Sequence, residues 1–324
     1  MKITRDSVRG GSLGPPLLDY LRQIPDGLLF FRQHQIRHPL GIYNLSLQQL
    51  AVDFAAVLDE YFAVTRRCEL VLDGKFSEPT ELLTRHKALL YTMRSHLDDC
   101  CLVLKAFVDS SVSPSCSVFT ETYVAESKLP GFKTFQQALA GYLQGYLAPV
   151  TNKLKHQQGM MRAIVLYGDG FARVGYFVEE PDKDGVMAPS HDVHKGGNSA
   201  FSFARDILFN LFQLYYCSER IAKVVLQVLS AKGHHLQPTP EPAGEPWTRL
   251  IKAAAQVNSS LVFPDEPKRG LPSLRFTPGT SPELVLKYPD KGILLRSQKR
   301  LKFTVFTKGD GISRSFKMPY WKSP

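Results

Sequence analysis

The sequence predicts an α+β fold, in which a mainly helical bundle with a β-hairpin insertion is followed by a small basic β-rich domain. Three observations predict this fold. Long stretches repeat apolar residues at intervals of three and four, which is the period of one helix face. Near residue 160 the pattern changes to strand-like runs around a glycine-rich turn. After a proline-rich stretch the chain becomes strongly basic and again strand-like.

The same observations divide the chain into four segments. Residues 1–43 are expected to form an irregular N-terminal arm, because glycines and prolines interrupt its early periodicity. Residues 44–232 are expected to form the helical bundle, with the hairpin inserted at about 160–180. Residues 233–246 contain four prolines and are interpreted as a linker. Residues 247–324 are expected to form the basic β-rich domain.

The bundle is predicted to begin with two long helices. Ser46 and Gln49 have the spacing of a capping box, which favours a helix start at Ser46. A second helix is expected from Pro79, because proline is tolerated in a first helical turn. A third runs from Phe132 to about residue 158, and Pro149 should kink or split it, since its ring cannot continue the hydrogen-bond ladder.

The hairpin consists of two strand-like runs on either side of residues 168–170, a short Gly-Asp-Gly turn. The loop over residues 185–198 has room for one further short strand. Asn198 or Ser199 is expected to cap a fourth long helix. The first half of that helix is apolar nearly all round, so we expect it at the centre of the bundle.

The segment after the linker is predicted to contain one short helix over residues 247–257. Short strands are then expected at 283–288, 292–296, 301–307 and 312–317. Within 301–307, Leu301, Phe303 and Val305 alternate with Lys302, Thr304 and Phe306. This alternation predicts one buried face and one basic, partly aromatic face.

The cysteines indicate the cellular compartment of the protein, and the hydropathy of the chain indicates whether it meets a membrane. The five cysteines are odd in number and lack CxxC spacing, which favours reduced thiols and a cytoplasmic protein. No run of about 18 apolar residues lacks a charge, so no membrane partner is expected. No cofactor motif is found. His191, Asp192 and His194 lack further nearby ligands, so no metal site is predicted.

Charge is distributed unevenly along the chain. From Lys268 to Pro324 there are 13 Lys and Arg against 3 Asp and Glu, and the preceding residues are balanced. Such asymmetry predicts an anionic partner, RNA or DNA, for the last segment. Cationic side chains pair with phosphates, and aromatic rings stack on unpaired bases. The candidate nucleic-acid-binding residues are Arg296, Lys299, Arg300, Lys302, Phe306, Lys308, Arg314, Lys317 and Trp321.

The stretch "PVTNKLKHQQ" ends the third predicted helix with a polar cluster of Asn152, Lys153, Lys155 and His156. Asn and His at this spacing, near the end of a helix in a four-helix bundle, resemble the HEPN superfamily of prokaryotic helical domains. Many members are metal-independent ribonucleases or their inactive relatives. The resemblance implies that His156 would take the proton of a ribose hydroxyl. The signature arginine is replaced by Thr151.

Three functions follow from these patterns. The leading interpretation is a non-catalytic, nucleic-acid- or nucleoprotein-binding accessory protein that makes contact through its basic C-terminal domain. The first alternative is a metal-independent ribonuclease of the HEPN type that uses His156. The second is a protein-interaction scaffold, whose helical bundle contacts a protein partner or a second copy of the chain. A basic helix end at His156 also has a purely structural interpretation, because Lys and His favour the carbonyl end of a helix.

Overall fold

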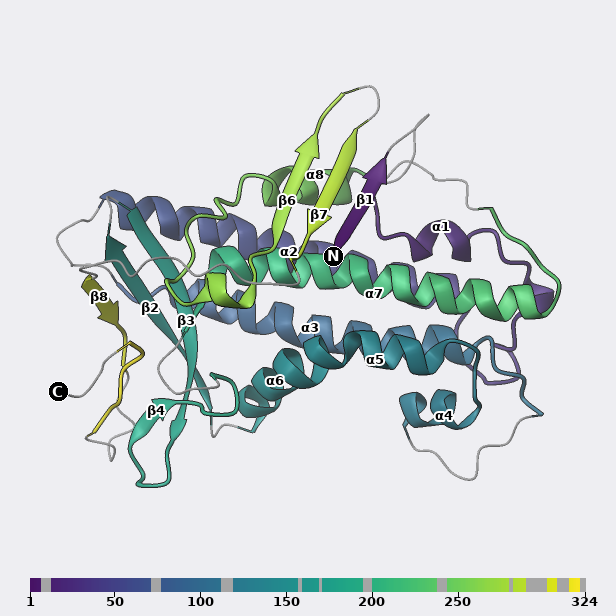
Figure 1. Ribbon diagram of the computed structural model, residues 1–324, viewed down its shortest axis with the longest axis horizontal. Helices are drawn as coiled ribbons and strands as arrows, with labels where there is room; N and C mark the ends of the chain where they lie inside the picture. The colour runs from purple at the N-terminus through teal and green to yellow at the C-terminus, as the bar shows by residue number, and fades with distance from the viewer. Residues whose placement is uncertain are drawn as a thin grey trace.

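The computed structural model describes residues 1–6, 13–70, 77–111, 119–156, 159–168, 171–194, 200–237, 244–279, 282–289, 302–307 and 315–320. Three long helices run side by side along the molecule: α2 (Pro39–Leu70), α3 (Thr80–Lys105) and α7 (Phe203–Ala231) (Figure 1). One antiparallel sheet lies at an end of this bundle, and a second lies beside α7 and α8. The predicted α+β class is confirmed.

Shorter helices complete the bundle. They are α1 (Leu17–Leu21), α4 (Thr120–Glu126), α5 (Phe132–Tyr142), α6 (Ala148–Lys155) and α8 (Glu245–Ala254). Two 3-10 turns, η1 (Asp26–Leu28) and η3 (Glu266–Arg269), lie in connections. α8 confirms the short helix expected after the prolines, and it begins inside the stretch that was interpreted as a linker.

The third predicted helix is divided as its proline required. A π-helical turn, η2 (Leu143–Leu147), separates α5 from α6, and Pro149 lies in the first turn of α6. Proline has no N–H to donate to the preceding turn, so the regular ladder cannot pass through this position.

Two helix starts differ from the prediction. α2 begins at Pro39 rather than at Ser46, and the hydroxyl of Ser46 bonds the ring of His96 at 2.9 Å instead of capping a helix. Ser202, rather than Asn198 or Ser199, caps α7 by accepting from the backbone N–H of Arg205 at 3.3 Å. Residues 198 and 199 lie outside the described parts of the chain.

α7 is the central helix, as its composition predicted. Every residue from Phe203 to Ser218 is buried, so the helix is enclosed on all sides over this length. The main apolar core lies between α2, α3, α7 and the adjoining sheet. A small second core, Ile164, Leu166, Phe177, Ala200 and Phe263, lies on the other face of that sheet.

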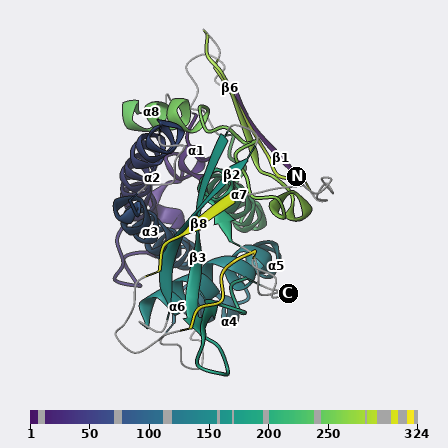
Figure 2. The same cartoon turned by 90° about the vertical axis from the view of Figure 1, so that its left-hand side faces the viewer.

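The larger sheet has strand order β4-β3-β2-β8 and is entirely antiparallel. The predicted hairpin is β2 (Met160–Gly168) with β3 (Phe171–Pro181), and the further strand is β4 (Met187–Pro189). A two-residue strand, β5 (Phe201–Ser202), also pairs with β3. β8 (Lys302–Val305) lies beside β2 at the end of the bundle (Figure 2).

The second sheet has three strands in the order β1-β7-β6. β1 (Lys2–Asp6) comes from the beginning of the chain, while β6 (Ser273–Thr277) and β7 (Glu283–Lys287) come from the basic segment. The segment expected to be an irregular arm therefore contains a paired strand as well as α1. The strand expected at 292–296 lies outside the described residues.

Both sheets combine strands from before and after residues 233–246. β8 pairs with β2, and β7 pairs with β1. α8 packs on α2, and the indole N–H of Trp247 donates to the hydroxyl of Tyr215 at 2.8 Å. Separate folding of residues 247–324 stays a prediction, which cleavage of the chain between the two parts would test.

Within the described residues, no helix is both long and apolar enough to cross a bilayer. The described cysteines, Cys68, Cys100, Cys101 and Cys217, are free and buried.

Candidate functional sites

The structure describes three of the candidate nucleic-acid-binding residues, Lys302, Phe306 and Lys317, and each has a different environment. Lys302 is exposed on β8, with no ion pair to any described residue, while Phe303 and Val305 pack on the small core. Phe306 follows the strand and is partly buried against the main core. Lys317 is exposed and forms an ion pair with Asp182, which raises the pKa of Lys317.

The remaining candidates fall outside the described residues. They are Arg296, Lys299, Arg300, Lys308, Arg314 and Trp321. Of the set predicted from the sequence, Lys302 is therefore the described residue best placed to meet a phosphate.

The three-stranded sheet carries a group of cations that the sequence analysis missed. Lys2 lies directly opposite Lys287, and Lys287 lies directly opposite Ser273. Arg275 follows two residues later on β6 and so shares this face. We call Lys2, Arg275 and Lys287 the cationic face; all three side chains are exposed.

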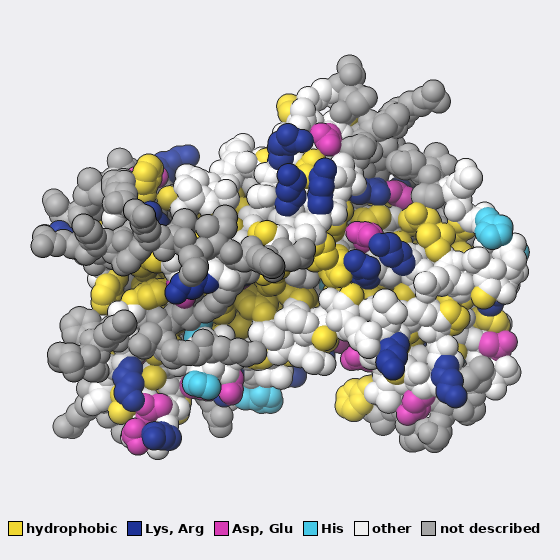
Figure 3. Space-filling model, in the orientation of Figure 1, with side chains coloured by type: hydrophobic (Ala, Val, Ile, Leu, Met, Phe, Trp, Pro, Cys, Tyr) yellow, Lys and Arg dark blue, Asp and Glu magenta, His cyan; other side chains and the backbone are white. Residues whose placement is uncertain are grey.

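Figure 3 shows basic side chains gathered over these three strands. Acidic residues lie toward the other end of the same face, where Asp6 is opposite Glu283, and Glu283 lies 3.7 Å from Arg275. Neither Lys2 nor Lys287 forms an ion pair with a described residue. The positive charge at this end of the sheet is therefore left open to solvent.

The polar cluster at the end of α6 is held by carboxylates of the neighbouring segment. Lys153 lies 2.6 Å from Glu180 on β3 and 2.9 Å from Asp192 in the following loop. These bonds raise the pKa of Lys153 and lower that of Asp192. The cation thus fastens the helix end to the hairpin.

His156 is exposed as the last residue of the α6 turn, where its backbone N–H donates to the Asn152 carbonyl at 3.3 Å. Asn152 and Lys155 are also exposed. The hydroxyl of Thr151 is buried and donates to the Leu147 carbonyl at 2.8 Å. In the described parts of the chain, the hydrogen bonds and ion pairs of these residues involve no arginine, so the HEPN-like activity stays a prediction.

The histidines of the loop after β4 do not converge on a common point. Asp192 is paired with Lys153, whereas His194 is buried and its Nε2 accepts from the Val178 N–H at 2.9 Å. Among the described residues, no group of three His, Cys, Asp or Glu side chains is arranged to hold a metal ion.

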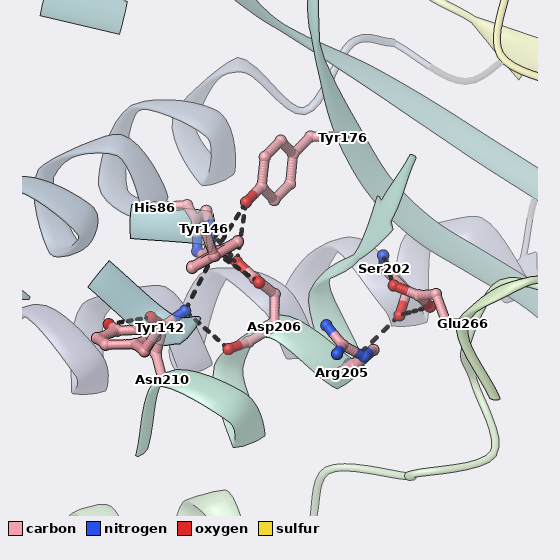
Figure 4. Close-up of polar contacts among 9 residues, drawn as sticks. All are labelled: His86, Tyr142, Tyr146, Tyr176, Ser202, Arg205, Asp206, Asn210 and Glu266. Carbon is pink, nitrogen blue, oxygen red and sulfur yellow. Dashed lines mark hydrogen bonds and ion pairs between the residues drawn. The ribbon is translucent and has the colours of Figure 1, made fainter. Parts of the chain in front are cut away.

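A buried polar cluster surrounds Asp206 in the first turn of α7. His86 of α3 donates from Nε2 to Asp206 Oδ2 at 2.7 Å, and Tyr146 of η2 donates its hydroxyl at 2.6 Å from either carboxylate oxygen. Tyr176 of β3 also donates, at 2.9 Å. Figure 4 shows these side chains converging on Asp206, together with Asn210 one turn later on α7.

Both oxygens of the Asp206 carboxylate accept hydrogen bonds. Burial first, and then the negative charge of Asp206, raise the pKa values of Tyr146 and Tyr176 well above their ordinary value. Both hydroxyls therefore keep their protons and act as donors. The Nδ1 atom of His86 is buried without a hydrogen-bond partner among the described residues.

A second buried acid lies beside the cluster. Glu266 of η3 accepts from the Ser202 and Phe263 backbone N–H groups at 2.8 and 2.7 Å, and from the Ser202 hydroxyl at 2.5 Å. Burial raises the pKa of Glu266 to about 7, while the positive charge of Arg205 opposes this shift. Arg205 lies between Asp206 and Glu266 in Figure 4.

No family model, curated protein or solved structure matches this chain. Its function is therefore inferred from the chemistry of the cationic face and of the buried clusters.

Proposed function

We propose that the protein binds nucleic acid in a non-catalytic accessory role, through a surface that includes the cationic face and basic residues of the C-terminal segment. The observation that carries the proposal is the position of Lys2 directly opposite Lys287. Like charges directly opposite one another destabilise a sheet. A phosphate between the two ammonium groups would turn this repulsion into attraction.

The sequence after β7 extends the positive charge. Lys287 ends the strand, and Lys291, Arg296, Lys299 and Arg300 follow in the sequence before Lys302 begins β8. Only Asp290 is acidic between Lys287 and Lys302. Clustered lysines and arginines are typical of surfaces that follow a phosphate backbone.

The proposed contacts are with the backbone of the nucleic acid rather than with its bases. Phe306, expected from the sequence to stack on bases, is partly buried against the core. Lysine binds phosphate as a point charge and carries no sequence information. We therefore propose binding that is independent of sequence and sensitive to salt, to RNA or DNA. The free buried thiols suit a reducing compartment such as the cytoplasm.

Titration with a labelled DNA duplex tests the proposal. The triple variant Lys2→Glu, Arg275→Glu, Lys287→Glu should bind far more weakly, and the slope of log K against log salt should shrink by about 0.9 for each phosphate that the variant no longer neutralises. The control is Lys133→Glu, Lys232→Glu, Lys252→Glu, which changes three exposed lysines elsewhere by the same charge. The two triple variants have the same net charge, so a difference between them reports the location of the charge.

Equal affinity of the parent and the first triple variant, with both folded by circular dichroism, would contradict the proposal. An equal loss of affinity in both triple variants would indicate attraction by net charge alone. Binding of an acidic protein but of neither RNA nor DNA would assign the face to a protein partner instead.

A further inference from the structure

A cavity of about 220 Å³ lies beside the first turn of α7. Its walls come from η2, the loop after β4, β5, α7 and the residue after β7. The lining residues that matter here are Gly145, Tyr146, Phe201, Arg205, Phe209 and Tyr288. Four of these side chains are aromatic and one carries a positive charge. The cavity therefore combines planar apolar walls with a single cation.

Arg205 is the unusual member of this lining. Its side chain is buried, at 5% exposure, and its guanidinium lies 4.9 Å from the ring centre of Phe209. Nε donates to the Gly270 carbonyl at 3.3 Å, whereas the two terminal nitrogens have no hydrogen-bond partner among the described residues. These nitrogens keep accessible surface and Arg205 lines the cavity, so their N–H donors are open to an acceptor that enters it.

Glu266 is not the acceptor for the terminal nitrogens of Arg205. Its two oxygens are occupied by Ser202 and by the Phe263 N–H, and it forms no ion pair with Arg205 within the described chain. The positive charge of Arg205 acts on Glu266 through space, where it opposes the rise in the pKa of the acid. The two terminal nitrogens of the Arg205 guanidinium can therefore donate to an acceptor inside the cavity.

The opposite wall is held rigidly. Gly145 and Tyr146 belong to the π-helical turn, a feature that is frequent at functional sites. The hydroxyl of Tyr146 is fixed by both oxygens of Asp206 and accepts from Asn210 Nδ2 at 3.4 Å. Its ring meets Phe201 and Phe209 edge to face. The cavity walls are thus set in position before any ligand arrives.

We propose that this cavity binds a small aromatic carboxylate, whose two oxygens accept from the terminal nitrogens of Arg205 and whose ring packs among Phe201, Phe209 and Tyr288. The guanidinium fork matches a carboxylate in bidentate geometry. The volume lies below the range of roughly 300–1,000 Å³ for drug-sized ligands, which limits the occupant to a single ring. This proposal is independent of the cationic face.

Calorimetric titration with benzoate, nicotinate and anthranilate tests the site. At least one of them should saturate a single site below about 10 mM, with benzamide and acetate at least about tenfold weaker. Benzamide lacks the charge and acetate lacks the ring. Inorganic phosphate is the fourth comparison, and binding of phosphate without any of the carboxylates would overturn the assignment.

Two variants locate the binding. Arg205→Lys keeps the charge beside Glu266 but removes the fork, and should weaken binding at least about tenfold. Gly145→Leu places a side chain at the cavity rim, where an added Cβ meets no atom within 4 Å, and should block the ligand without disturbing the fold. Gly141→Leu, one turn earlier and equally open, is the matched control and should bind like the parent.

The proposal is overturned if none of the three carboxylates binds by about 10 mM. It is also overturned if Gly145→Leu binds as well as Gly141→Leu does. Should Arg205→Lys fail to fold, the comparison of the two glycine variants decides the matter alone.

Discussion

Lys2 and Lys287 lie directly opposite one another across the β1–β7 pair, and the terminal amine of Met1 donates to the Tyr288 carbonyl at 2.8 Å. The start of the chain is thereby joined to the basic C-terminal segment. On the reverse face of the same strands, Ile3, Leu284 and Leu286 are buried in the core. Apolar burial fixes the register, so the fold brings these two lysines together despite their repulsion.

The pairing of strands across the proline-rich stretch predicts how a cut chain behaves. Once the chain has been cut at a specific protease site inserted within residues 238–243, the two fragments should elute together in size-exclusion chromatography. β1–β7 and β2–β8 pairing would hold them. Fragments that separate in native buffer and remain folded would instead support an independent domain at 247–324.

Asp206→Asn should lower the free energy of unfolding by about 2–4 kcal/mol, because an amide places a donor against hydroxyls and a histidine that already donate. Urea denaturation measures the change. Asp98→Asn is the control, since it makes the same chemical change at an exposed α3 position and should cost no more than about 0.5 kcal/mol. Equal effects would mean that the buried carboxylate is not needed for stability.

Glu266 should make the protein less stable as the pH rises. Its pKa is about 7 when folded, against an ordinary value of 4.5. The folded state therefore holds this proton more tightly, and the stabilisation is fully present below pH 4.5 and lost as pH rises through 7. The loss of stability should approach roughly 3 kcal/mol. Denaturation of Glu266→Gln across this range should lack that decline; an unchanged slope would contradict the assignment.

His96 should have the opposite effect. Burial lowers its pKa from 6.5 to about 3. The neutral ring therefore stabilises the fold fully above pH 6.5, and this contribution is lost as the pH falls through 3. His96→Gln preserves a polar contact to Ser46. This variant should lose less free energy of unfolding than the parent as the pH falls. Titration of His96 near its ordinary pKa of 6.5, followed by NMR, would contradict this prediction.

Local patterns were enough to predict much of the fold. Periodicity identified the long helices, Pro149 predicted the break between α5 and α6, and the Gly-Asp-Gly turn predicted the β2–β3 hairpin. The start of α2 was missed because Ser46 has the spacing of a cap but bonds His96, which lies on another helix. A single sequence gives no sign of such a distant partner.

The candidate sites were harder to predict because distant segments build them. The cationic face joins Lys2 to residues of β6 and β7, and no local pattern pairs the first strand with those. The Asp206 cluster draws on α3, η2, β3 and α7. One signal was present: Asp206 and Asn210 lie four residues apart within the mostly apolar first half of α7, and buried polar groups of this kind need partners.

The variant Lys287→Glu tests the central claim most directly, because it changes stability and binding in opposite directions. An acid opposite Lys2 replaces a repulsive pair by an attractive one, so the free energy of unfolding should rise by roughly 0.2–1 kcal/mol. Affinity for a labelled duplex at low salt should fall, and the salt dependence should become shallower. A variant that is at least as stable as the parent and binds the duplex just as tightly would contradict the account.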